Sequence, residues 1–259
     1  SDVCSSDLMV VLEHSLKNYH KEIDIVTTPT GEEVGMVHCN NCTSEINRFV
    51  SLFQQYNKLL KINMSDDEVY SVLFKHSLKG QNDCGNVVVS NYLSGENITN
   101  IEKGYPLTAS LDNFNFNLAN YMKAHLYSAF ATLKIGIDIM KREENIKVVK
   151  FYAQGGLFKT KDVAQLYLAS ALDTEISVMK NAEEGGAWGM ALLAKYILVD
   201  ENDLCKYLNE NVFKNIKTHS LKPDKNLVIG FEEYINNFKK IIEIERLFNK
   251  FSSKNGDKI

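Results

Sequence analysis

The chain has 259 residues, 44% of them hydrophobic and 24% charged, with a formal net charge of -4. This composition is typical of a globular protein with a substantial core, and no basic stripe indicates a nucleic-acid partner. The apolar runs are short and interrupted by charge, so none approaches the roughly 20 apolar residues of a membrane span. We therefore expect a cytoplasmic protein that binds neither nucleic acid nor membrane.

The chain begins with the string SDVCSSDL, residues 1–8. A common sequencing adapter encodes this string in one reading frame, and the string lacks the charged and apolar regions of a signal peptide. We expect residues 1–8 to be non-native and the natural gene to continue upstream. Residues 9–259 contain no Ser/Pro-rich linker, so we expect them to form one domain.

Three short apolar runs near the N-terminus predict three strands, at residues 9–13, 23–27 and Glu33–Cys39. The residues around Pro29 and Gly31 favour a turn between the second run and the third. Because the three runs follow one another closely, we expect an antiparallel meander.

Two helices are predicted next, because the period of the apolar residues changes. Apolar side chains recur at helical spacing over residues 46–60, with Thr43 or Ser44 as the N-cap. Ser65 and Glu68 have the spacing of a capping box, which predicts the start of a second helix.

The rest of the chain alternates between the two kinds of element. Strands are predicted at residues 86–90, 147–153 and 175–180, a long helix at 118–141, and mainly helix over the C-terminal part. This order indicates an α/β fold with a mixed sheet flanked by helices and a helical C-terminal tail.

The strongest local signal is the turn Gln154-Gly155-Gly156, which follows one of these strands and precedes a helix. Glycines let a ligand approach the backbone closely, and a helix N-terminus offers free N–H groups. In open α/β sheets, ligands bind beyond the carboxyl ends of the strands. The turn therefore indicates a ligand site, although a tight turn without a ligand is the alternative.

A second glycine-rich segment, residues 185–189, follows the strand at 175–180 and opens a helix of small residues. If the two preceding strands are neighbours, the two turns are adjacent and a nucleotide can lie across both. The alternative is that small residues only allow close helix–sheet packing. The sequence contains neither a P-loop nor a Rossmann fingerprint, which disfavours those two nucleotide folds.

The five cysteines have no regular spacing, which argues against a disulfide scaffold. Cys39 and Cys42, preceded by His38, are the only candidate metal or redox pattern, and no second pair completes a four-ligand zinc site. We expect both cysteines to be packing residues, and no metal to be bound by side chains of this chain.

Four segments, in order and spacing, resemble the C-terminal domain of the FGGY family of carbohydrate kinases. The segment GGLFKTKDVAQLYLASAL is similar to the family's adenosine motif, and GAWGMA to its Gly-Ala-x-Gly-x-Ala helix start. Upstream, VVVSNYLSGENIT resembles the segment with a Tyr-Leu-Ser-Gly-Glu core, and ANYMKAHLYSAFATLKIGIDIM resembles the long helix between the motifs. The resemblance covers residue 9 to about residue 250.

The resemblance implies a ribonuclease-H-like, actin-like ATPase fold, with sugar and ATP meeting between this domain and an N-terminal sugar-binding domain that the chain lacks. The side chains and backbone that it assigns to the nucleotide are those of Gly155, Gly156, Thr160, Gly186, Asp112 and Asn113. Gly95 and Glu96 would lie toward the cleft, on the substrate side.

Two departures from the family pattern concern the same site. The usual Gly-Gly-Gly-Ala-Lys-Ser string reads QGGLFK here, so Lys159 falls one place late, and residues 109–113 lack the glycine often found beside the adenine. The family's catalytic aspartate and its Gly-Thr phosphate turn are expected just upstream of Met9. We therefore expect no catalytic residue in this chain, and no activity from it alone.

When complete, the protein is expected to transfer the γ-phosphoryl group of ATP, with Mg²⁺, to a sugar hydroxyl. The stretch NNCTSEINRF and the motif around Trp188 favour a xylulokinase- or ribulokinase-like enzyme that acts on a pentulose. A glycerol- or gluconate-kinase-like member, a non-catalytic ATP-binding or scaffold protein of the same fold, and a domain without a ligand are the alternatives. The identity of the sugar and the oligomeric state, including a homodimer, stay open.

Overall fold

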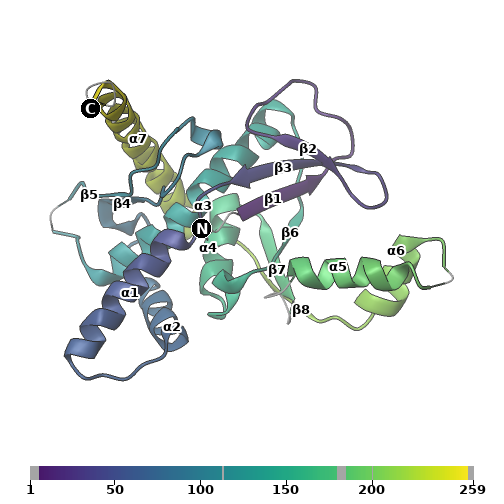
Figure 1. The fold of residues 1–259 in the computed structure, drawn as a ribbon, viewed down its shortest axis with the longest axis horizontal. Coiled ribbons are helices and arrows are strands. Elements are labelled where there is room, and N and C mark those ends of the chain that lie inside the picture. Colours follow the sequence, from purple (N-terminus) through teal and green to yellow (C-terminus); the bar gives the residue numbers. More distant parts are fainter. Residues whose placement is uncertain (1–5, 113, 180–184, 200, 256–259) are drawn as a thin grey trace.

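The computed structural model describes residues 6–112, 114–179, 185–199 and 201–255 (Figure 1). Its strands are β1 (Ser6–Val11), β2 (Asp24–Thr27), β3 (Glu33–Cys39), β4 (Val87–Ser90), β5 (Leu107–Ser110), β6 (Lys150–Ala153), β7 (Glu175–Met179) and β8 (Thr218–Leu221). Its α-helices are α1 (Ser44–Leu59), α2 (Asp66–Ser77), α3 (Leu118–Glu143), α4 (Val163–Leu172), α5 (Gly185–Tyr196), α6 (Leu204–Tyr207) and α7 (Lys225–Asn255). The alternation of strands and helices confirms the α/β class.

The first sheet is antiparallel as expected, but its strand order is β1-β3-β2 and the predicted meander is wrong. A meander would place the second strand in the middle. β3 takes that place because its side chains are mostly buried, whereas those of β2 are mostly exposed. The connection over residues 12–23 is long enough to carry the chain past β3. The first three residues of β1, Ser6–Leu8 in the expected adapter segment, pair with β3 as well.

The second large sheet is mixed and has the order β6-β7-β8. β6 and β7 are parallel and joined by α4, the crossover that parallel neighbours require, whereas β8 is antiparallel to β7. β8 was missed in the sequence because its residues, THSL, are largely polar and exposed. The side chain of Gln165 links β7 to β8, because its Nε2 donates to the carbonyl oxygens of Ile176 and His219 at 2.8 and 2.9 Å.

The long helix α3 forms the centre of the molecule. Most of its residues are buried, and it packs against β1 and β3 on one side and against α2, α4 and α7 on others. Burial over most of its surface is typical of a helix in a core position. The C-terminal helix α7 also contributes to the core, where Phe231, Tyr234 and Phe238 are buried.

The predicted capping box at the start of α2 is present. The Ser65 hydroxyl accepts from the Glu68 amide at 3.3 Å, and the Glu68 carboxylate accepts from the Ser65 amide at 2.8 Å. At the start of α1, Thr43 occupies the N-cap position but makes no side-chain capping bond. The residue pattern thus predicted both helix starts and the chemistry of one of them.

Gly136 marks the closest approach of α3 to β3. A methyl group on its Cα would collide with Cγ1 of Val37, which is fully buried. By contrast, a methyl group at Gly189 in α5 would meet no atom within 4 Å.

We predict that Gly136→Ala lowers the free energy of unfolding by about 1–2 kcal/mol, because overpacking outweighs the gain in helix propensity. The matched change Gly189→Ala has the same gain without a clash and should cause no loss. Urea denaturation of both variants measures this difference. Equal effects of the two changes would contradict the close packing of α3 on β3.

Glu144 ends α3 and anchors the loop that follows β1. Its carboxylate accepts from the amides of Lys17 and Asn18 at 2.7 and 3.1 Å and lies 2.6 Å from Nε2 of His20. The amide of Lys17, followed by His20, lowers the pKa of Glu144 to about 2. The ordinary pKa of a glutamate is about 4.3. Because the pKa in the folded protein is lower, the ionised carboxylate of Glu144 contributes its full stabilisation at pH values above about 4.3.

We predict that Glu144→Gln destabilises the protein at pH 7, and that its difference from the wild type shrinks as the pH falls from about 5 to about 2. The contribution is lost in this window because the folded carboxylate becomes protonated only near its lowered pKa. Denaturation across this pH range measures the effect. Glu13→Gln, at an exposed residue of the loop that follows β1, is the control. A pH-independent difference for Glu144→Gln would contradict the prediction.

Candidate functional site

The turn after β6 has the conformation that requires glycine. Gly155 has φ 118°, in the region that side chains disfavour, and Gly156 starts a short 3₁₀ turn that ends at Phe158. The amide of Phe158 donates to the carbonyl oxygen of Gly155 at 3.1 Å. A methyl group at either glycine would meet nothing within 4 Å, so the backbone faces open space there.

The second glycine-rich segment lies beside the first. β6 and β7 are parallel neighbours, so their carboxyl ends share one edge of the sheet. A Cβ on Gly185, the first residue of α5, would collide with the side chain of Gln154. The expectation that the two segments are adjacent is therefore confirmed. Residues 180–184, with Glu183 and Glu184, lie outside the described residues.

Residues 185–189 open a helix as expected, because they form the first turn of α5. Gly186 and Gly189 both face open space, because a Cβ on either would meet nothing within 4 Å.

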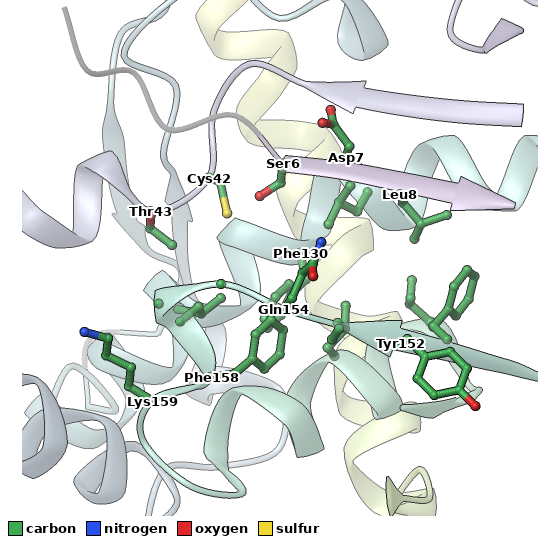
Figure 2. Close-up of a pocket in the computed structure, with 18 of the residues that line it drawn as sticks. Ser6, Asp7, Leu8, Cys42, Thr43, Phe130, Tyr152, Gln154, Phe158 and Lys159 are labelled. Carbon is green, nitrogen blue, oxygen red and sulfur yellow. The ribbon is translucent and has the colours of Figure 1, made fainter. Parts of the chain in front are cut away.

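A cavity of about 1440 Å³ opens beside the first turn (Figure 2). Its walls come from β1, from the start of α1, from α2 over residues 67–75, and from residues of α3 and α4. The whole stretch 147–161 also lines it, and this stretch includes the predicted residues Gly155, Gly156 and Thr160. Thr160 is largely buried in this wall, and Figure 2 shows the side chain of Gln154 in the centre of the view. The cavity and the glycine turn thus form one candidate site.

The charge around the cavity is mostly positive. The lysines in its lining are Lys75, Lys147, Lys150, Lys159 and Lys161, and the carboxylates are Asp7 and Asp67. Lys150 is partly neutralised, since its Nζ lies 3.4 Å from a carboxylate oxygen of Glu175 outside the lining. Open backbone next to a surplus of cationic side chains suits an anionic ligand.

Among the described residues predicted for the nucleotide, Asp112 and Gly186 lie outside this cavity lining. Asp112 follows β5, and its carboxylate accepts from the amide of Phe114 at 3.0 Å and from Nδ2 of Asn115 at 2.8 Å. The carboxylate of Asp112 therefore forms hydrogen bonds within the loop that follows β5. Asn113 lies outside the described residues. The assignment of both to the nucleotide stays a prediction.

Gly95 and Glu96 also lie outside the cavity lining, and Glu96 is fully buried. Its Oε2 accepts from the amides of Asn40 and Asn41 at 2.9 and 3.2 Å, whereas Oε1 has no hydrogen-bond partner. Burial raises the pKa of Glu96 above its ordinary value. Glu96 thus fastens the loop between β3 and α1, and its role on the substrate side stays a prediction.

Sequence reasoning missed Asn41, which is buried and links two loops. Its Oδ1 accepts from the amides of Leu93 and Ser94 at 2.9 and 3.0 Å, while its Nδ2 donates to Glu96. Asn41 and Glu96 together fix the start of α1, where Cys42 and Thr43 line the cavity. An Asn-Asn pair between a strand and a helix carries no pattern that distinguishes this role from an ordinary turn.

Cys39 and Cys42 are buried and form no disulfide, and burial raises the pKa of the Cys39 thiol well above its ordinary value. A raised pKa disfavours the thiolate that metal binding and redox chemistry use. The described residues contain no group of three or more His, Cys, Asp or Glu side chains that could hold a metal. Within the same residues, no helix is long and apolar enough to cross a membrane.

The family model for the C-terminal domain of the FGGY family of carbohydrate kinases matches residues 5–198. The chain belongs to this family. The match confirms the resemblance and includes both glycine-rich segments, the long helix and the loop of Glu96. A search of curated proteins gave no match.

Solved structures of kinases share the fold. Xylulose kinase from Rhodospirillum rubrum has a TM-score of 0.69 at 13% identity, over 94% of this chain and 46% of that one. Gluconate kinase from Lactobacillus acidophilus has a TM-score of 0.67 at 15% identity, over 95% and 46%. Plasmodium falciparum glycerol kinase with ADP has a TM-score of 0.67 at 14% identity, over 93% and 45%. The fold is therefore the ribonuclease-H-like, actin-like ATPase fold, and the chain spans less than half the length of these kinases.

Proposed function

We propose that this chain is the nucleotide-binding half of an ATP-dependent sugar kinase. The observation that supports this most directly is the meeting of two glycine segments at the carboxyl ends of the parallel strands β6 and β7, inside a domain of the FGGY family. The proposed contacts to the nucleotide come from Gly155, Gly156, Thr160 and Gly186. Gly156 and Thr160 are proposed on the adenine side, and Asp112 and Asn113 are proposed as further nucleotide residues.

The residues present fit a nucleotide. The glycines leave open space where other residues would carry a Cβ, and the lysines of the cavity wall complement phosphate charge. The N-terminus of α5 adds free N–H groups beside Gly186. Bound ATP supplies the γ-phosphoryl group, and Mg²⁺ neutralises the charge on its phosphates. Since the described residues offer no carboxylate cluster for a metal, we propose that Mg²⁺ is held by the nucleotide and by the other half of the kinase.

The role of this chain is to bind and orient the nucleotide. In phosphoryl transfer, most of the rate acceleration comes from positioning and from electrostatic stabilisation. A fixed turn such as Gly155-Gly156 serves this purpose, because its backbone is held by β6 and by the bond between Phe158 and Gly155. The acid that accepts the proton of the sugar hydroxyl is proposed to lie in the N-terminal half, as are most of the sugar contacts. Gly95 and Glu96 are proposed on the substrate side of the cleft.

For the acceptor we propose a pentulose such as xylulose or ribulose, in a cytoplasmic enzyme. The structural neighbours include kinases named for xylulose, gluconate and glycerol, so the fold alone accommodates several acceptors. The shifted Lys159 favours a second candidate, a non-catalytic ATP-binding or scaffold protein of the same fold. An assay of the complete polypeptide distinguishes the two.

We predict that the complete polypeptide, with ATP and Mg²⁺, phosphorylates xylulose or ribulose faster than gluconate or glycerol. A coupled assay for ADP release, with each acceptor in turn, measures the rates. Fast turnover of gluconate or glycerol would replace the pentulose assignment. ATP binding without turnover of any acceptor would favour the scaffold function.

We predict that Gly156→Leu in the complete polypeptide weakens ADP binding about tenfold or more, because the side chain fills the open space beside the turn. The same space lets the side chain fit without a clash in the free protein, so folding should be unchanged. Ser51→Leu, on the exposed face of α1, is the control for an added apolar side chain. Calorimetry measures both affinities, and equal values for Gly156→Leu and the wild type would remove this turn from the site.

A further inference from the structure

The loop formed by residues 94–105 folds closely on itself. Glu96 and Ile101 pair within it, because the amide of each donates to the carbonyl oxygen of the other, at 2.7 and 3.0 Å. A Cβ on Gly95 or Gly104 would collide with backbone atoms across the loop. Close packing of this kind couples the two ends of the loop.

One end of loop 94–105 is fixed beside the cavity. The carboxylate of Glu96 accepts from the amides of Asn40 and Asn41. The next two residues, Cys42 and Thr43, line the cavity. The position of the loop therefore affects the cavity wall at the start of α1.

The C-terminal half of α7 holds the other end of the loop. Nη2 of Arg246 donates to the carbonyl oxygen of Thr99 at 2.6 Å. The side chain of Asn249 accepts from the amide of Lys103 at 3.0 Å and donates to its carbonyl oxygen at 2.9 Å. These bonds join residues that are 146 or 147 positions apart, so the loop depends on tertiary contact with α7.

Glu245 adds a further contact from a fully buried position. Its Oε1 accepts from the amide of Tyr105 at 3.3 Å, whereas its Oε2 has no hydrogen-bond partner among the described residues. The hydroxyl of Ser90, at the end of β4, is near Glu245 but makes no regular hydrogen bond with it. Burial raises the pKa of Glu245 to about 7, and Ser90 and Tyr105 oppose this rise.

In the described part of the chain, no ion pair compensates a charge on Glu245. β4 and β5 carry no charged side chain, and Glu102 on the loop is exposed. The cations on the elements that pack around Glu245 have other partners: Arg246 pairs with Glu243, Lys103 lies over the ring of Tyr105, and Lys134 on α3 pairs with Asp138 and Glu232. A buried carboxyl group without a cationic partner favours its protonated form.

We propose that Glu245 is a positioning residue, which holds loop 94–105 on α7 while its carboxyl group keeps a proton and releases the loop as it ionises. The inference rests on the proposed function in one respect, that Gly95 and Glu96 lie on the substrate side of the cleft. Release of the loop from α7 weakens the support of Glu96, so the acceptor is bound less well.

The direction of the pH dependence follows from the raised pKa. The proton on Glu245 stabilises the closed loop fully below about pH 4.3, the ordinary pKa of a glutamate. This stabilisation is lost as the pH rises through about 7. Between about pH 6 and about pH 8, the equilibrium constant for closing should fall about tenfold.

Hydrogen exchange on the complete polypeptide, without sugar or nucleotide, tests the proposal. We expect the protection factor of the Tyr105 amide, corrected for intrinsic exchange, to fall about tenfold from about pH 6 to about pH 8. It should stay constant in Glu245→Gln, which is neutral and has nearly the same shape. The amide of Ile62, bonded to the carbonyl oxygen of Asn57 at 2.9 Å, is the internal control.

A constant protection factor of Tyr105 in the wild type would overturn the proposal, as would an equal fall in Glu245→Gln. Asn249→Ala is the matched variant, because it removes a contact to the same loop that does not titrate. It should lower the protection of the Lys103 amide by the same factor at both pH values. A loss that depends on pH in Asn249→Ala would assign the titration to a group other than Glu245.

The role in positioning is measured by the kinetics of the complete polypeptide. We expect KM for the acceptor to rise about threefold or more over the same pH range in the wild type, and to rise less in Glu245→Gln. Equal KM profiles would overturn the positioning role. ADP binding and turnover at one pH test the proposed function separately, and hydrogen exchange reports on the loop whether or not any acceptor is phosphorylated.

Discussion

The contact between α3 and the first sheet is the constraint on which the rest of the structure depends. Gly136 lets the helix approach Val37 without a side chain between them, and the helix in turn supports α4, on which β7 and β8 pack. Because protein interiors are close-packed, displacement of α3 would move both sheets. The glycine segments of the candidate site depend indirectly on this helix. α3 supports α4, α4 packs against β7, and β7 positions β6 through the hydrogen bonds of the parallel pair.

Local patterns in the sequence predicted the elements that depend on neighbouring residues. The capping box of Ser65, the long helix α3 and the strand β3 all follow from periodicity or from short-range side-chain bonds. The adjacency of the two glycine segments was also predictable, because a strand, a helix and a second strand form a parallel pair with a right-handed crossover. Family membership was predictable from the order and spacing of the four motifs together, whereas no single motif would have established it.

What could not be predicted depends on contacts between residues far apart in the sequence. The position of β3 between β1 and β2 follows from the burial of its side chains in the folded molecule. The polar segment β8 forms a strand because it pairs with the outer edge of β7. The family resemblance placed Glu96 toward the cleft, and no local pattern predicted its burial. Its contacts with Asn40 and Asn41, 55 or 56 residues away, lie in the interior of the molecule. The cavity between β1 and β6 depends on how two sheets are placed in the folded molecule, so no local stretch of sequence predicts it.

Helix α5 has no buried side chain among its described residues, and in Figure 1 it extends away from the body of the molecule with α6 near its far end. Tertiary packing therefore contributes little to its stability, and its first turn, against Gln154, is where it meets the core. Segments of this kind unfold locally at a lower free energy than the core around them. Protease cleavage should consequently begin in α5, and a ligand that contacts its first turn would protect the whole helix from digestion.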